Sequence, residues 1–154
     1  MSAGAVRSLL PDDAAAARAL IAANIGPRYR MRVVEQLDAA LAGDDAECRG
    51  MVALQQAVGG VSGLLLAGVV AGAAGVVKLH ALIGRDRPAL LTLLDALVAS
   101  CAERAVRMIV CELADDPSLA MFQGVVLERG FAREGRLDDF FADGVALDLM
   151  VWRA

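Results

Sequence analysis

The sequence predicts an α/β (α+β) fold in which helices cover both faces of one mixed β-sheet. Helical and strand patterns alternate along all 154 residues. Short apolar runs separated by glycine-rich turns fill the middle of the chain, as expected of buried strands. The last third runs strand, helix and hairpin, so parallel and antiparallel pairing should occur in the same sheet.

Length and composition bound the class of protein. A chain of 154 residues buries roughly 70% of its unfolded surface, so we expect one domain over 1–154. Apolar residues make up 58%, which excludes a disordered chain. A net charge of -4 argues against a nucleic-acid partner. Three scattered cysteines and one histidine indicate no disulfide framework and no metal site, and they fit a cytoplasmic location.

Caps and apolar periodicity define the N-terminal half. Asp12 or Asp13 can cap a first helix that ends at Ile25, with Gly26 as its stop. A second helix has one apolar face and is closed by Gly43. The expected elements are a strand over 6–10, helices over 12–25 and 28–41, and strands over 48–56, 61–71 and 76–83.

The C-terminal half begins with a strongly amphipathic helix that opens at Asp86-Arg87-Pro88. A strand over 106–113 follows, and Asp116 caps a helix over 117–129. Strands over 131–141 and 145–152 are joined by Asp143-Gly144, a typical hairpin dipeptide. The predicted order is β-α-α-β-β-β-α-β-α-β-β.

One uncharged stretch, over 57–77, has the length of a membrane-spanning helix. It is rich in glycine, and each glycine costs about 1 kcal/mol in a helix. Two buried strands joined by a turn explain the same profile better. We therefore expect no membrane partner.

Several segments resemble the GNAT acyltransferase family. Glu128-Arg129-Gly130-Phe131 is similar to the family's last helix end and the start of its sixth strand. The run over 134–144 resembles the hairpin of a bacterial subgroup, and Leu79-His80-Ala81-Leu82 resembles the fourth strand. Together with the element order, the resemblance covers the whole chain. It implies transfer of an acetyl or short acyl group from acetyl-CoA to an amine of a small molecule or peptide.

The resemblance implies cofactor contacts in two places. In the family, the fourth strand bonds the pantetheine arm through its backbone, which points to Leu79, Ala81 and Leu82. A loop at the start of the third helix holds the CoA pyrophosphate, with the pattern Gln or Arg, two residues, Gly, one residue, then Gly or Ala. Here Pro88 replaces the first glycine and Leu90 replaces the second small residue.

The cofactor-binding candidates that remain in this loop are Arg85, Arg87 and Ala89. Either guanidinium can pair with phosphate. Asp86 opposes an anion with its own charge. A capped helix start with solvated arginines explains the same residues, so both interpretations stay open.

A second departure concerns acid–base chemistry. Many family members carry a tyrosine, four residues before the Gly-Phe pair, that protonates the departing thiolate. Val126 occupies that position and has no proton to donate. His80 titrates near neutrality and is a candidate general base if it faces the cleft. Glu112 on the fifth strand is a second candidate. A structural histidine and an ion-paired carboxylate are the alternatives.

Residues on the acceptor side are also implied by the resemblance. Tyr29 belongs to the region that lines this side in the family, and the arginines around it would suit an acidic acceptor or the CoA 3′-phosphate. These arginines are Arg28, Arg30 and Arg32. Asp139 and Phe140 lie in the hairpin beside the acceptor pocket, where an aspartate would attract a cationic amine. For Tyr29 we favour packing, and for the arginines a solvated helix face. Turn-side solvation and hairpin packing are the alternatives for Asp139 and Phe140.

Two functions follow. The first is an acyl-CoA-dependent N-acyltransferase that works by direct attack of the amine on the thioester. The second is a catalytically degenerate module of the same fold that binds CoA or another protein, because both signature features depart from the family pattern. The high apolar fraction would suit a further interface such as a homodimer.

Overall fold

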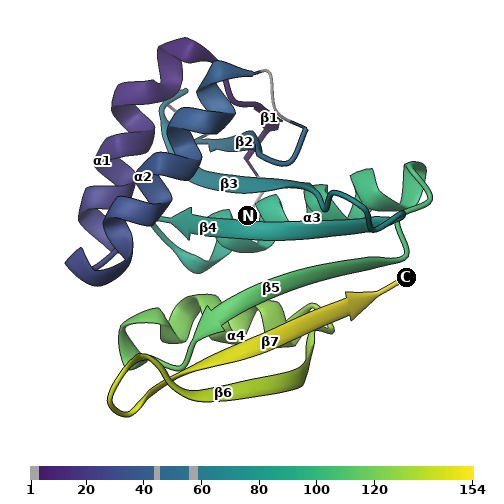
Figure 1. The fold of residues 1–154 in the computed structure, drawn as a ribbon. Coiled ribbons are helices and arrows are strands. Elements are labelled where there is room, and N and C mark those ends of the chain that lie inside the picture. Colours follow the sequence, from purple (N-terminus) through teal and green to yellow (C-terminus); the bar gives the residue numbers. More distant parts are fainter. Residues whose placement is uncertain (1–3, 44–45, 56–58) are drawn as a thin grey trace.

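A computed structural model describes residues 4–43, 46–55 and 59–154. They form a seven-stranded sheet with the order β1-β2-β3-β4-β5-β7-β6 (Figure 1). The strands are Val6–Ser8 (β1), Arg49–Leu54 (β2), Val61–Val69 (β3), Val76–Gly84 (β4), Met108–Ala114 (β5), Ala132–Ala142 (β6) and Val145–Arg153 (β7). The helices are Ala14–Asn24 (α1), Pro27–Ala42 (α2), Arg87–Glu103 (α3) and Ala120–Glu128 (α4), with short 3-10 turns at Pro11–Asp13 (η1) and Pro117–Leu119 (η2). The predicted element order and mixed α/β class are confirmed.

Local signals explain most helix ends. The Asp86 carboxylate accepts a hydrogen bond of 3.0 Å from Ala89 N–H and so caps α3. Asp116 accepts one of 3.0 Å from Ser118 N–H and opens η2, which leads into α4. Gly43 ends α2 in the left-handed region, with φ 77°.

One predicted cap is confirmed only in position: Asp13 is the N-cap residue of α1, but its side chain bonds elsewhere. Neither Asp12 nor Asp13 caps α1 through its side chain. Instead, Asp13 is buried, pairs with Arg7 at 2.7 Å and accepts a hydrogen bond of 2.8 Å from Leu10 N–H. The carboxylate therefore bonds Arg7 of β1 and the backbone at the start of η1, and not the N–H groups of α1.

The uncharged stretch over 57–77 contributes β3 and the start of β4, as two buried strands. Residues 57 and 58 of this stretch, and Gln56 of the predicted strand over 48–56, lie outside the described residues. No helix in the described part of the chain is long and apolar enough to cross a membrane.

Helices cover both faces of the sheet, as predicted. In Figure 1, α1 and α2 lie over β3 and β4 on the near side, and α3 and α4 lie on the far side. Leu64 and Leu66 of β3 pack with α1 and α2, whereas Leu65 between them packs with α3. Consecutive residues are therefore buried, which explains the unbroken apolar run in this strand.

The sheet opens between β4 and β5. These strands pair in parallel only from Val76 with Met108 to Leu79 with Cys111. The β3–β4 register shifts across Leu79 and Ala81, so His80 is the extra residue of a bulge in β4. Because a bulge bends its strand, β4 turns away from β5 while β5 continues along β7, and Figure 1 shows the two strands diverging.

Candidate active site

A cleft of about 570 Å³ lies where β4 and β5 separate. Its walls come from β4, the end of β5, the α1–α2 region, the start of α4 and the tip of the β6–β7 hairpin. The predicted site residues that line the cleft are Tyr29, Leu79, His80, Ala81, Leu82, Glu112 and Phe140. Arg85, Arg87, Ala89 and Asp139 are not among its described lining residues.

The β4 wall offers backbone as well as side chains. Beyond Leu79, this strand bonds β3 on one edge and has no β5 partner on the other within the described chain. Backbone groups on an open strand edge can bond an extended ligand, as a further strand would. Residues 81–84 therefore present such an edge to the cleft.

The orientation of His80 is set by a backbone carbonyl. Its Nε2 lies 2.7 Å from Glu47 O. A carbonyl oxygen only accepts, so Nε2 carries the hydrogen and the lone pair of the neutral ring resides on Nδ1. Gly68 permits this arrangement, because a Cβ there would lie 2.0 Å from Glu47 O.

Burial lowers the pKa of His80 below 6.5. The hydrogen bond to Glu47 opposes that effect, while the nearby charges of Lys78 and Arg32 add to it. The imidazole is therefore neutral at pH 7 and retains a basic nitrogen.

Glu112 is held between two cations. Lys78 Nζ lies 3.1 Å from its Oε1, and Arg32 Nη2 lies 3.3 Å from its Oε2. Burial alone would raise the pKa of Glu112, but the hydrogen bonds and charges of Lys78 and Arg32 outweigh it and hold the pKa below its usual value. A carboxylate stabilised in this way is a weak base, so His80 is better suited to accept a proton.

Tyr29 bridges the mouth of the cleft. Its hydroxyl donates a hydrogen bond of 2.8 Å to Asp116 Oδ2 on the β5–α4 loop, and its ring packs edge-on against Phe141 at 5.6 Å. Burial, followed by the bond to Asp116, raises the pKa of Tyr29, so the phenol stays protonated. No local pattern could predict this hydrogen bond, because the two residues are 87 positions apart.

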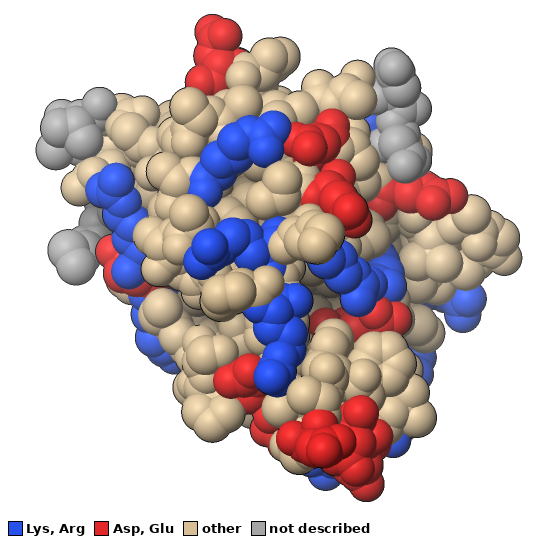
Figure 2. Space-filling model, turned by 60° about the vertical axis from the view of Figure 1, so that its left-hand side comes forward, with Lys and Arg blue, Asp and Glu red and all other residues tan. Residues whose placement is uncertain are grey.

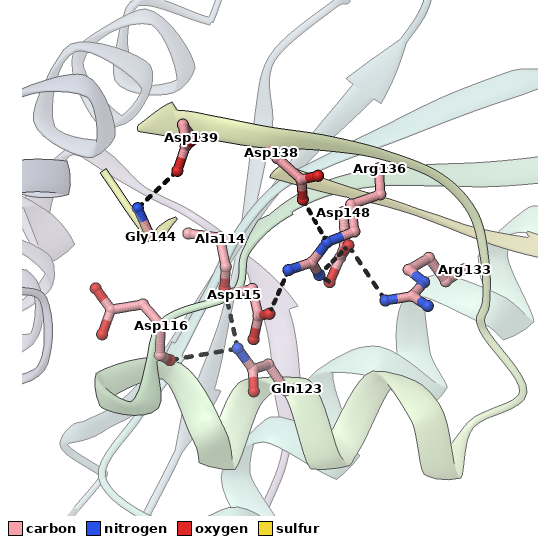
Figure 3. A network of polar contacts seen from close by, with 10 residues as sticks. All are labelled: Ala114, Asp115, Asp116, Gln123, Arg133, Arg136, Asp138, Asp139, Gly144 and Asp148. Atoms are coloured by element: carbon pink, nitrogen blue, oxygen red, sulfur yellow. Dashed lines mark hydrogen bonds and ion pairs between the residues drawn. The ribbon is translucent and has the colours of Figure 1, made fainter. Parts of the chain in front are cut away.

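The hairpin acids bond within their own region (Figure 3). Asp139 has φ 54°, and its carboxylate accepts a hydrogen bond of 2.7 Å from Gly144 N–H in the turn. Arg136 bonds three carboxylates at 3.0 Å, those of Asp115, Asp138 and Asp148. These charges stabilise the hairpin and are not directed into the cleft.

The polar groups at the start of α3 also have partners within the chain. The Asp86 carboxylate takes the Ala89 N–H, and Pro88 has no N–H to offer. Arg87 pairs with Glu128, and Arg85 Nη1 lies 3.4 Å from Gln55 Oε1. An anion at this helix end would have to displace the Asp86 carboxylate.

Val126 and Cys111 are both buried. Val126 is completely buried in the apolar core. Burial raises the pKa of Cys111 to about 12, so its thiol is neutral. In the described part of the chain, no group of three His, Cys, Asp or Glu side chains is placed to hold a metal ion.

Comparison with solved structures defines the class of fold. A protein from Desulfovibrio desulfuricans assigned to the GNAT acetyltransferase family superposes with a TM-score of 0.82 at 18% identity, over 97% of this chain and 98% of that one. A ribosomal-protein-alanine N-acetyltransferase from Brucella melitensis gives 0.69 at 18%, over 97% and 99%. An aminoglycoside 6′-N-acetyltransferase from Enterococcus faecium gives 0.76 at 14%, over 97% and 96%.

The sequence comparisons add no nearer relative: no family model matches the chain, and no curated protein is significantly similar to it. At these identities the structural likeness establishes the fold alone. The chain therefore has the GNAT acetyltransferase fold, and its activity has to be argued from the cleft.

The state of His80 can be measured directly, because it is the single histidine of the chain. We expect an imidazole NMR titration with a midpoint below 6.5 and a neutral ring protonated at Nε2. The unfolded protein is the control and should titrate at about 6.5. A folded midpoint at or above that of the control, or a ring protonated at Nδ1, would contradict the burial and the Glu47 contact.

Proposed function

We propose that this protein is an N-acetyltransferase that moves an acetyl group from acetyl-CoA to an amine of a small molecule or peptide. The observation that carries the proposal is the divergence of β4 and β5 at the His80 bulge, which opens a cleft beside an unpaired strand edge. The GNAT fold of the chain supports it. The cytoplasmic location and the homodimer remain predictions.

The cofactor would contact two regions, the open edge of β4 in the cleft and the start of α3. The pantetheine arm is extended and bears amides, which suits the open edge of β4 at Ala81 and Leu82 beside the apolar side chain of Leu79. The pyrophosphate would lie at the start of α3, near Arg85 and Arg87. This second region fits less well, because the chain's own carboxylate caps the helix.

The chemistry requires a base and a place for developing negative charge. His80 Nδ1 would take the proton of the attacking amine, as its Nε2 is held by Glu47 O. A backbone N–H of residues 81–84 would stabilise the oxyanion. Acetyl-CoA supplies a thioester whose thiol has a pKa of about 8.5, so the thiolate can leave without a tyrosine acid. With Val126 in place of a tyrosine, the reaction would therefore be slower but not prevented.

The second candidate is a catalytically degenerate module that binds CoA weakly or binds another protein. One observation favours it. At the start of α3, the Asp86 carboxylate already accepts the Ala89 N–H and Arg87 is paired with Glu128, so few groups remain to bind a pyrophosphate. Cofactor binding separates the two candidates.

We expect acetyl-CoA to bind and Asp86→Ser to bind it about two- to tenfold more tightly, because serine keeps the helix cap without the negative charge. Isothermal titration calorimetry measures both affinities. Asp38→Ser is the control, since it removes an equal charge from an ion pair with Arg18 on the surface. No heat and no thermal shift at millimolar acetyl-CoA would contradict the enzyme proposal.

We expect His80→Gln to lower kcat/KM for acetyl transfer by about 10²-fold or more, as is typical for loss of a general base. The wild-type rate should fall as pH drops below 6.5, through the lowered pKa of His80, because the protonated ring has no lone pair. The variant should lack this acid limb, whereas Glu112→Gln should retain it. An active His80→Gln enzyme with an unchanged pH profile would exclude His80 as the base.

A further inference from the structure

The charges of the cleft are unbalanced. Among its described lining residues, three carry cationic side chains, Arg28, Arg32 and Lys78, and one carries a carboxylate, Glu112. Figure 2, with the left-hand side of Figure 1 turned forward, shows Lys and Arg side chains across the middle of this face, with Asp and Glu side chains above them and in a group below them. The cleft therefore carries net positive charge.

Nearby acids only partly offset this charge. Glu112 is shared between Lys78 and Arg32, so one carboxylate serves two cations. Asp116 acts on Arg28 through its charge but already accepts hydrogen bonds from the Tyr29 hydroxyl and Ser118 N–H, and it does not line the cleft.

The polar residues of the α2 wall form a row. Arg28, Arg32 and Gln36 follow one another at intervals of four, so they lie on one side of the helix, and all three line the cleft. Gln36 Oε1 is buried and has no hydrogen-bond partner among the described residues. A buried amide oxygen without a donor is costly, so it favours a ligand that brings an N–H group.

We propose that the acceptor is an amine that also carries an anionic group, such as a carboxylate or phosphate. The anion would bind Arg28 and Arg32, and the amine N–H groups would face Gln36 further along the same helix. The inference rests on the proposed acetyl transfer and names its substrate class. An acceptor with additional positive charge, which the acidic hairpin had suggested, would be repelled by these arginines.

The test compares amino acids from glycine to γ-aminobutyrate with their carboxamides, which replace the carboxylate by a neutral amide. Rates are expressed per unprotonated amine, because the carboxylate also raises the pKa of a nearby amine. We expect each acid to have a higher kcat/KM than its carboxamide. Arg32→Gln should reduce that ratio about tenfold or more, mainly through KM, as expected for loss of a charge-assisted hydrogen bond. Arg28→Gln should act in the same direction. Arg18→Gln, in an exposed ion pair with Asp38, should leave the ratio unchanged.

Three other outcomes would overturn the inference, each in a different way. Equal or faster turnover of the carboxamides would overturn it while acetyl transfer itself stands. If Arg32→Gln weakens acetyl-CoA binding and leaves the ratio unchanged, the arginines hold a cofactor phosphate and not the acceptor. If no amine is acetylated although acetyl-CoA binds, the proposed function fails and this inference fails with it.

Discussion

The loss of pairing between β4 and β5 after Leu79 is the feature on which the site depends. One extra residue, His80, bends β4, and β5 keeps its bonds to β7 as far as Ala114 with Leu147. The same bulge therefore opens the cleft, frees a strand edge and carries the histidine. The chemical proposals for this chain rest on that departure from regular pairing.

The open arrangement is held from both sides. Gln123 donates hydrogen bonds to Ala114 O at 2.9 Å and to Asp116 O at 3.3 Å, which fixes the end of β5 against α4 (Figure 3). On the other side, a Cβ at Gly84 would lie 2.9 Å from Leu90 Cδ2. The bulky Leu90, which was predicted to replace a small loop residue, is thus a buried core residue that packs where β4 has no side chain.

Local signals in the sequence were enough for the element order, the cap at Asp116 and the Asp143-Gly144 hairpin, because each depends on neighbouring residues. The contacts that define the cleft join distant segments. Arg32 and Glu112 are 80 positions apart, so no local pattern could have paired them. Asp86 shows a further limit, because the same residue can cap a helix or oppose a phosphate, and only the fold shows which bond it makes.

Amide hydrogen exchange along β4, with and without acetyl-CoA, tests the central claim most directly. Residues paired with β5, such as Leu79, should be protected in both states. Amides of residues 81–84 that do not bond β3 should exchange quickly in the free protein and slow markedly when acetyl-CoA is added. Protection of these amides before the cofactor is added, or no change after it, would contradict an open strand edge that binds the pantetheine arm.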